Sequence, residues 1–239
     1  MHTQLTKYIV LIAIIIQSAS FKAQTKKIEP INAEKGKLIF SDDFERTQLG
    51  KDWKVRDRFK NGAYTLENGV LKGKQLKGIN HGSVMRVKFD YSNIIAEFDV
   101  KFNGGERFNI VMDDSTNTTS YWGHIQRISF SKNGFKIKDD KTGAMDLKIQ
   151  KQLKNNPKRA KELKPFLDSK ISTTKFNFKE NTWYHVIITK KGDILQCQVG
   201  DTIGQLKSEG IAHPILNKFG PTVNGDHFLF DNFKIWAIK

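Results

Sequence analysis

The sequence contains only one cysteine, Cys197, so no disulfide bond can form within a single chain. Cys197 lies far from the N-terminal apolar run, which argues against a lipoprotein type of anchor. No later segment approaches the roughly 20 apolar residues that a membrane-spanning helix requires. Glycine patterns of nucleotide sites and the motifs of nucleic-acid-binding modules are missing too. We therefore expect stability to come from burial alone, with no nucleic-acid partner and no transmembrane segment.

Residues 1–23 have the pattern of a signal peptide. A positive charge at Lys7 precedes an apolar run from Tyr8 to Ile16, and small residues follow it. Cleavage after Ser20 or before Gln24 fits this pattern. The sequence thus predicts a secreted or periplasmic protein with a polar N-terminal segment at 24–36 and one domain at 37–239.

Positive charge dominates what is present. Lys and Arg number 40 against 25 Asp and Glu, which gives a formal net charge of +15. Outside the cytoplasm, a cationic protein meets anionic polysaccharides and lipid surfaces more readily than nucleic acids. Charge alone does not identify the partner.

Alternating apolar and polar residues indicate β-strands. The clearest example is 96–102, where Ala96, Phe98, Val100 and Phe102 alternate with charged residues; 85–89 and 107–113 follow the same period. These three segments are expected to neighbour one another in a meander. Turn-forming dipeptides separate the expected strands at Asn61-Gly62, Asn68-Gly69, Asn103-Gly104, Asn133-Gly134, Gly192-Asp193, Gly200-Asp201 and Asn224-Gly225.

Later segments extend this pattern with one exception. Residues 183–199 predict a further hairpin, and 227–238 predict the last strand. Lys148–Lys170 instead has apolar residues at helical spacing, with Asn156 as a helix cap and Pro157 at the first helical position. The sequence therefore predicts an all-β protein of two stacked antiparallel sheets, with one short helical insertion near 146–165.

Several segments together resemble a known superfamily. They are Leu38–Phe44, Tyr64–Leu71, Glu97–Val100, Trp183-Tyr184 and Phe230–Ile235. They are similar to segments of secreted proteins of the concanavalin A-like lectin and glucanase superfamily, and more narrowly of 3-keto-disaccharide hydrolases and laminarinase-like domains. This resemblance implies a jelly-roll β-sandwich that acts on or binds carbohydrate.

One catalytic carboxylate of the laminarinases is missing from this sequence. Laminarinases of glycoside hydrolase family 16 carry Glu-x-Asp-x-(x)-Glu on one strand. Glu97 and Asp99 fit the first two places, but Lys101 or Phe102 stands at the third. A retaining glycosidase needs two carboxyl groups about 5–5.5 Å apart. A glycoside hydrolase or lyase without this mechanism is one interpretation, and a non-catalytic glycan-binding module is the alternative.

A cluster of polar residues supplies the candidate site. The alternation places Arg86, Asn109 and Asp113 outward on their strands, and His81 and His124 stand at strand starts. The candidate catalytic residues are His124, His81, Asp113 and Arg127. The candidate substrate-binding residues are Arg86, Asn109, Trp122 and Gln126. An ordinary solvated polar face explains the same pattern equally well.

If the cluster is catalytic, an imidazole is the natural base at neutral pH. The ketone of a 3-ketoglycoside acidifies the neighbouring C2 proton. His124 or His81 is the candidate to remove it, with Arg86 or Arg127 stabilising the enolate oxygen.

Acidic residues suggest two calcium sites, each with a simpler interpretation. The resemblance implies a structural calcium ion near the chain ends, held by Asp43 and Asp231 with Asp42, although edge-strand polarity explains these residues as well. Residues 139–143 could bind calcium but are also good turn formers.

Among the other features, Trp53, Trp183 and Trp236 are expected in the core, whereas Trp122 lies in a loop and offers a flat face to a sugar ring. The lysines of 148–170 indicate a solvated helix face, or attraction to anionic polysaccharide or membrane.

Overall fold

The computed structural model describes residues 28–239, so the predicted signal peptide lies outside the described residues. The strands are β1 (Lys35–Asp42), β2 (Lys54–Val55), β3 (Tyr64–Glu67), β4 (Val70–Gly73), β5 (Ser83–Arg86), β6 (Ile94–Asp113), β7 (His124–Ser131), β8 (Gly134–Asp139), β9 (Ile171–Lys175), β10 (Trp183–Lys191), β11 (Ile194–Val199), β12 (Thr202–Lys207) and β13 (Lys218–Ile238). The helices are α1 (Leu147–Leu153) and α2 (Pro157–Ser169), with short 3-10 turns η1 (Asp57–Phe59) and η2 (Tyr121–Gly123).

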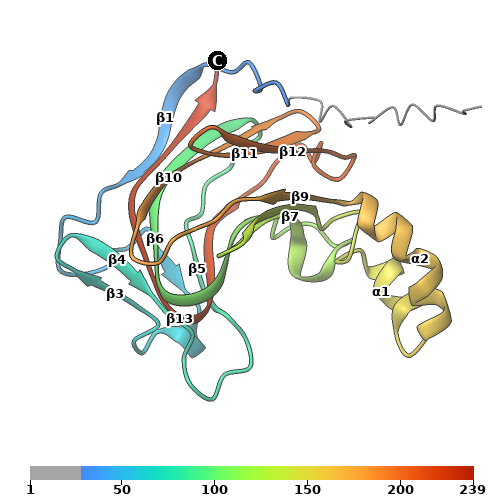
Figure 1. The fold of residues 1–239 in the computed structure, drawn as a ribbon, viewed down its shortest axis with the longest axis horizontal. Helices are drawn as coiled ribbons and strands as arrows, with labels where there is room; N and C mark the ends of the chain where they lie inside the picture. The colour runs from blue at the N-terminus through green and yellow to red at the C-terminus, as the bar shows by residue number, and fades with distance from the viewer. Residues whose placement is uncertain (1–27) are drawn as a thin grey trace, which may run out of the picture.

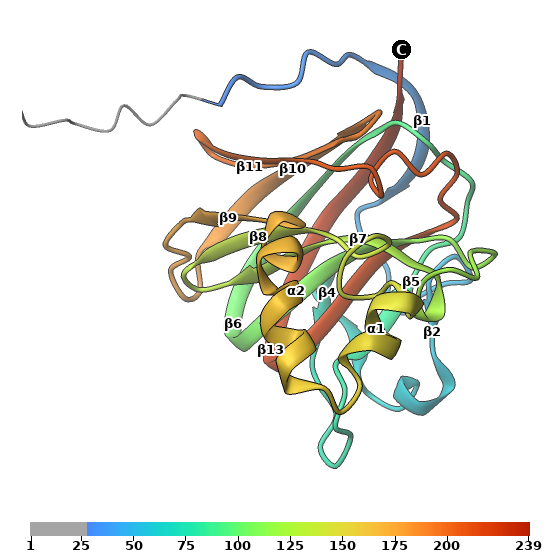
Figure 2. The same cartoon turned by 90° about the vertical axis from the view of Figure 1, so that its right-hand side faces the viewer.

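The strands form two antiparallel layers that share β6 and β13 (Figure 1). The first layer has the order β12-β11-β10-β6-β13, with β4-β3 and β1 on the far side of β13. The second layer has the order β9-β8-β7-β6-β13-β5-β2. Figure 2 shows β6 and β13 running side by side across the molecule, which joins the layers. The predicted two-sheet antiparallel sandwich is confirmed.

The two long strands pass from one layer to the other through a shared bend. Gly105 of β6 lies opposite Gly225 of β13, the register shifts there, and Gly104 and Gly225 have φ values of 91° and 82°. A Cβ atom on Gly105 would lie 2.1 Å from the Phe228 ring, so a larger residue does not fit. The glycines allow the bulge that turns both strands around the core.

This bend corrects the predicted meander. Residues 96–102 and 107–113 are two halves of β6, and β5 pairs with β13 and β2 instead of with β6. Asn103-Gly104 and Asn224-Gly225 therefore bend the chain without reversing it, because left-handed φ values serve a bulge as well as a hairpin. The Asn-Gly or Gly-Asp steps after β3, β7, β10 and β11 do connect hairpins.

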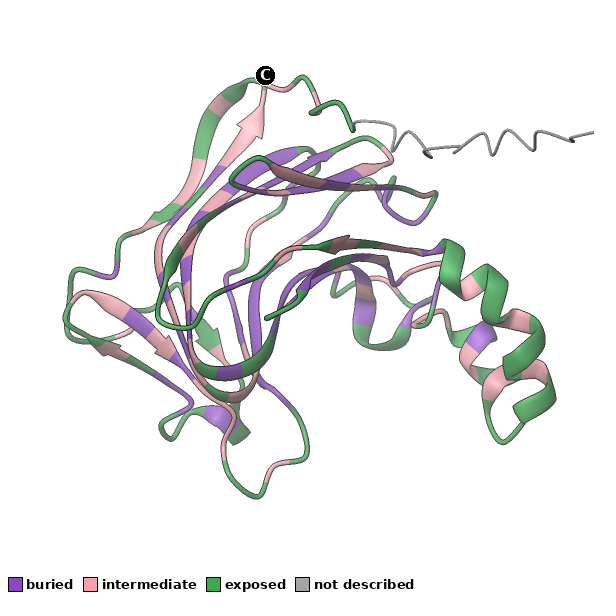
Figure 3. Cartoon of the chain, viewed as in Figure 1, coloured by how far each residue is buried: buried purple, intermediate pink, exposed green. Residues whose placement is uncertain are grey.

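Phenylalanine fills the space between the layers. Phe108 stacks on Phe130 with ring centroids 4.5 Å apart, and Phe98 of the other layer lies 6.5 Å from Phe108. All three side chains are fully buried, and Figure 3 shows the buried residues gathered on the facing strands. The even-numbered residues of β6 point into this core on both sides of the bend, where Gly104 and Glu106 are exposed, so the odd-numbered residues point outward in both halves.

Two aromatic predictions need correction. Trp53 is buried as expected, at 3% exposure, but Trp183 is 40% exposed and Trp236 is only half-buried. Trp183 lies opposite the outward residue Lys101 of β6, and directly opposed residues share a sheet face. The prediction for Trp183 was wrong because the residue lies in an apolar run of the sequence, which does not show that its side chain points outward.

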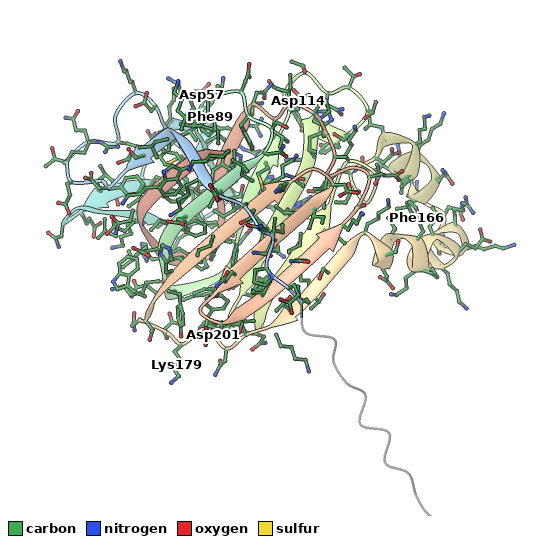
Figure 4. All side chains as sticks on the ribbon, turned by 90° about the horizontal axis from the view of Figure 1, so that it is seen from above. Asp57, Phe89, Asp114, Phe166, Lys179 and Asp201 are labelled. Carbon is green, nitrogen blue, oxygen red and sulfur yellow. The ribbon has the colours of Figure 1, made fainter. Side chains whose placement is uncertain are left out.

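The helical insertion forms a hairpin, α1 followed by α2, that projects from one side of the sheets (Figures 1 and 4). Asn156 caps α2 by accepting a hydrogen bond from the Arg159 backbone amide, and Pro157 takes the first helical position, as predicted. Helix α2 has no buried residue, and Phe166, labelled in Figure 4, is 42% exposed. Neither helix of the described chain has the length and apolar content to span a membrane.

Candidate functional site

The outer face of the second layer, which we call the polar face, carries most of the candidate residues. Directly opposed residues of neighbouring strands share a face, so the registers define its rows. One row runs through Thr222 of β13, Asn109 of β6 and Ser129 of β7. The next runs through Val111 and Arg127 to Lys138 of β8. Predicted outward residues from distant segments thus meet on one surface.

The outward side chains of β6 on this face are unusually well covered. Asn109 is 7% exposed, Val111 2% and Asp113 5%. Their outward neighbours on the first layer, Glu97 and Asp99, are only partly buried. The centre of the polar face is therefore covered, whereas the outer face of the first layer, which we call the back face, is more open.

Asp113 and His124 form a hydrogen-bonded pair at one end of the polar face. Asp113 Oδ1 lies 2.9 Å from His124 Nδ1. Because a carboxylate accepts, Nδ1 carries a proton, and in the neutral imidazole Nε2 is then an acceptor. The His124 side chain retains 24% exposure, so this nitrogen can meet a ligand. The pair has the arrangement of a base oriented by a carboxylate.

Arg86 lies beside this pair but is held by the protein itself. It donates to the carbonyl oxygens of Pro221 (2.6 Å) and Met85 (2.9 Å) and to Thr222 Oγ1 (3.0 Å). Its Nε lies 3.9 Å from Asp113 Oδ2 and has no hydrogen-bond partner in the described chain. Burial lowers the pKa of Arg86, and the Asp113 charge opposes that shift. Arg86 therefore supports Asp113 and is not free to stabilise an enolate.

Arg127 is also held by the protein, through an ion pair with Asp140 that we did not predict from the sequence. Its Nε and Nη2 donate to both oxygens of Asp140 at 2.5 and 2.9 Å. Burial disfavours the charge, but the Asp140 carboxylate raises the pKa of Arg127 above its usual value. Arg127 is thus committed to an ion pair, which contradicts its predicted role toward a reaction intermediate.

Two of the predicted substrate-binding residues have different surroundings. Asn109 Oδ1 accepts a hydrogen bond from Ser129 Oγ within the polar face. Gln126 is fully buried, and its Nε2 contacts Met112 Sδ at 3.5 Å. A bulge between Met112 and Asp113 shifts the register at the start of β7. Gln126 therefore does not line the polar face, because its side chain points into the interior.

Trp122 stands at the end of the polar face next to His124. It is 65% exposed and adopts a left-handed φ of 55° inside η2. Gly123 follows with φ 70°, and a Cβ there would lie 2.0 Å from the Asp114 carbonyl oxygen. The Arg56 guanidinium lies over the indole, 5.2 Å from its centroid. This tight turn holds the indole outward.

His81 does not join the His124 end of the face. It precedes β5, whose Ser83 lies opposite Val223, whereas His124 lies near the Lys218 end of β13. At about 3.3 Å per residue, the two histidines are roughly 20 Å apart along the strands. His81 Nδ1 contacts the Gly82 carbonyl oxygen, and its ring lies against Phe59. The predicted convergence of the two histidines was wrong.

Two further histidine–aspartate pairs between residues distant in the sequence went unnoticed. His213 is 9% exposed and lies 2.9 Å from Asp114 Oδ2 and 3.0 Å from Lys141 Nζ. Burial raises the pKa of Asp114, but hydrogen bonds from Thr116 and His213 more than offset this and lower it. Residue 213 lies 99 positions after Asp114, so no local pattern could reveal the pair.

The other pair lies on the back face. His185 Nδ1 contacts Asp99 Oδ1 at 2.7 Å, and Asn232 Nδ2 donates to Asp99 Oδ2 at 2.9 Å. Glu97 pairs with Lys35 at 2.5 Å. The two carboxylates that resemble the family 16 motif therefore lie on the face opposite to the polar face, each with its own partner.

The acidic residues predicted to hold calcium near the chain ends accept hydrogen bonds from the protein. Both oxygens of Asp42 accept from Arg46, and Asp43 Oδ1 accepts from the Glu45 backbone amide. In residues 28–239 no three or more His, Cys, Asp or Glu side chains are grouped to hold a metal ion. Burial, and then the negative charge of Asp99, raise the pKa of Asp231.

The second calcium candidate, residues 139–143, is a turn. Asp139 accepts from the Thr142 backbone amide at 3.0 Å and from the Gly210 amide at 3.0 Å. The neighbouring Asp140 is taken up by Arg127. These contacts match the simpler interpretation of the segment.

Comparisons with known proteins agree with this architecture. No family model matches the sequence, and no curated protein matches it. Solved structures match its fold, among them a non-specific endo-β-1,3(4)-glucanase of glycoside hydrolase family 16 (11% identity, 88% of this chain, 95% of the other, TM-score 0.58). LamA from Z. galactanivorans, in complex with laminaritriose and laminaritetraose, matches at 13% identity (85% and 100%, TM-score 0.52).

A third match, at 10% identity, is a Bacillus subtilis protein of unknown function with a galectin-like fold (86% and 98%, TM-score 0.54). The chain therefore has the fold predicted from its sequence, the concanavalin A-like jelly roll of lectins and glucanases. At these identities the likeness concerns the fold alone.

Proposed function

We propose that this protein is a secreted, carbohydrate-binding β-sandwich that holds a glycan on its polar face. The observation that carries this proposal is the run of outward polar groups from Thr222, Asn109 and Ser129 to the Asp113–His124 pair, which ends at the exposed Trp122. Sugars present hydroxyl groups and apolar ring faces together. A surface of hydrogen-bonding groups next to a flat aromatic ring complements both.

The back face differs from the polar face in how far its outward polar groups are covered. Glu97 and Asp99 are already paired with Lys35 and His185. Both exposed tryptophans have a cation over the ring, Lys101 for Trp183 and Arg56 for Trp122, so the faces differ in the polar groups around the ring. The neighbour solved with laminaritriose and laminaritetraose adds support at the level of the fold, and the predicted signal peptide supports secretion.

Two exposed tryptophans on opposite faces provide a matched test. In a glycan array followed by calorimetry, Trp122→Ala is expected to weaken binding about tenfold or more, as for an aromatic hot spot. Trp183→Ala removes an equal side chain from the back face and should leave the affinity unchanged. A loss confined to Trp183→Ala, or no glycan bound at all, would contradict the proposal.

The Asp113–His124 pair favours a second candidate function, proton abstraction from a bound sugar. Paired-carboxylate hydrolysis fits poorly, because Asp113 is bonded to His124 and Asp140 to Arg127. In a 3-ketoglycoside, His124 Nε2 would take the C2 proton and leave an enolate. Re-formation of the ketone would then break the C1–O bond, and the departing oxygen would take up a proton.

Product analysis separates this candidate from simple binding. With a 3-keto-disaccharide, His124→Ala should abolish turnover while binding persists, and Asp113→Asn should reduce the rate by disturbing the orientation of the imidazole. His81→Ala, at the other end of the face, is the control and should turn over normally. An intact disaccharide after incubation with the unaltered protein would reject catalysis and leave the binding function in place.

A further inference from the structure

The polar face collects cationic side chains that have no ion-pair partner in the described chain. Its rows bring together outward residues from β6, β8, β13 and the segment after β5. These residues are Arg107, Lys136, Lys138, Lys218 and Lys88. None of them lies within 4 Å of a carboxylate among residues 28–239.

The buried carboxylates of the face are engaged with other groups and do not pair with these cations. Asp113 is bonded to His124 and supported by Arg86, and Asp140 is bonded through both oxygens to Arg127. The positive charge is therefore not balanced within the face.

The cations are close enough to act on one another. Burial lowers the pKa of Lys138, and the neighbouring Arg127, Lys136 and Arg107 lower it further, against the pull of Asp140. Burial likewise lowers the pKa of Lys218. Grouping like charges on a partly enclosed surface destabilises the fold, so the arrangement calls for a negatively charged ligand that offsets the repulsion.

The back face shows that this is not a general property of a cationic chain. Lys35 there pairs with Glu97 at 2.5 Å, and His185 lies 2.7 Å from Asp99. The outward residues along the first half of β6 include charges of both signs, Glu97, Asp99 and Lys101. The unbalanced cations are concentrated on the face that carries the Asp113–His124 pair and Trp122.

We propose that the ligand of the polar face is an anionic polysaccharide, whose sulfate or carboxylate groups are bound by Arg107, Lys136, Lys138, Lys218 and Lys88. This rests on the proposed carbohydrate-binding function and names the class of glycan. Lysine side chains bind such groups as mobile point charges, so the charge of the polymer matters more than the geometry of one contact.

The helical hairpin extends the cationic surface beyond the sheet. Its start is tied to the Trp122 loop, since the Leu147 backbone amide donates to the Thr119 carbonyl oxygen and Ser120 bridges to Asp146. Lys148, Lys151, Lys154, Lys158 and Lys161 have no ion-pair partner in the described chain, whereas Arg159, Lys164 and Lys170 pair with Glu162, Asp168 and Glu209. Only Ile149 is buried among the apolar residues of the two helices. A long polymer on the polar face would have this surface within reach, whereas a short sugar would not.

The test compares a sulfated galactan, a polyuronate and neutral laminarin, measured by calorimetry with the mature chain at 50 and 200 mM NaCl. Binding to at least one anionic polymer should exceed binding to laminarin and should fall at higher salt, because ion release drives it. The sulfated and uronate polymers distinguish the two sources of negative charge. Equal or tighter binding of laminarin would overturn this inference while leaving the proposed function intact.

Charge-reversed variants locate the surface. Lys136→Glu with Lys138→Glu should weaken binding of the anionic polymer at least about tenfold, since two contacts change from attraction to repulsion. Lys179→Glu with Lys234→Glu makes the same change in net charge at exposed residues away from the polar face, and should weaken it by less than about twofold. Thermal melts verify that both double variants fold.

An equal loss in the two double variants would overturn the inference, because binding would then follow net charge alone. Vesicles containing an anionic phospholipid form a further arm of the test. If they bind with the same dependence on Lys136 and Lys138 while none of the polysaccharides binds, the surface serves a membrane and both proposals fail.

Discussion

The two halves of β6 follow one alternation of side chains and yet build two different surfaces. Glu97 and Asp99 in the first half point to the back face, where Glu97 pairs with Lys35 and Asp99 contacts His185. Asn109 and Asp113 in the second half point to the polar face, where they are nearly as buried as the core. The bend at Gly104-Gly105 separates the halves. Outward direction alone therefore does not make a residue part of a site.

The difference between the faces lies in how their charges are balanced. The back face carries an ion pair at its surface, Lys35–Glu97, whose lysine side chain is 45% exposed. On the polar face, the carboxylates form buried pairs with His124 and Arg127, and the lysines have no ion-pair partner. The lysines of the polar face are therefore available to a negatively charged ligand, whereas Glu97 and Asp99 of the back face already have protein partners.

The largest expected effects test whether the two halves share a core. Phe98→Ala in the first half and Phe108→Ala in the second should each lower the free energy of unfolding by about 3–5 kcal/mol, because each removes a fully buried ring. Urea unfolding followed by tryptophan fluorescence measures this. A clearly smaller cost in one half would show that the two layers are not equally supported and would weaken the comparison.

The next prediction contrasts one ion pair from each face. Asp140→Asn removes the charged partner of Arg127 and should lower the free energy of unfolding by about 2–3 kcal/mol, since a largely buried guanidinium loses its counter-charge. Glu97→Gln, in the more exposed pair with Lys35, should cost less than about 1 kcal/mol. Similar costs in urea melts would argue against a special enclosure of the polar face.

A third prediction concerns pH and the buried Asp114. The pKa of Asp114 is lower in the folded protein than in the unfolded chain, so its stabilising contribution is complete above about pH 4 and is lost as pH falls through the folded value. Asp114→Asn should cost about 1 kcal/mol at pH 6, and the difference from the unaltered protein should shrink toward pH 2. Thermal melts across this range measure it. A constant difference would mean that the hydrogen bonds of Asp114 do not depend on its charge.

The smallest effect is expected on the back face and has the opposite sign. The pKa of Asp231 is raised, so its ionisation destabilises the fold as pH rises past the unfolded value. Asp231→Asn should raise the melting temperature slightly at pH 7, by under about 1 kcal/mol in stability, and should have no effect near pH 3. A loss of stability at pH 7 would point to an unrecognised partner of this carboxylate.

The alternation of residues was sufficient to predict the sandwich and the shared face of Arg86, Asn109 and Asp113. It failed at Asn103-Gly104, because the same backbone conformation permits a hairpin or a bulge. It also could not supply the partners of the outward groups. Arg86 bonds Pro221, 135 positions away, and a bulge turns Gln126 inward. Such pairings are fixed by the register of distant strands, which local sequence does not specify.

The central claim is that ligand binds the polar face and not the back face, and a crystal structure with a bound oligosaccharide tests it most directly. Crystals soaked with a short fragment of the tightest-binding polymer should show sugar density in contact with Lys138, Trp122 and the Asp113–His124 pair. Density over Glu97, Asp99 and His185 instead would contradict the account.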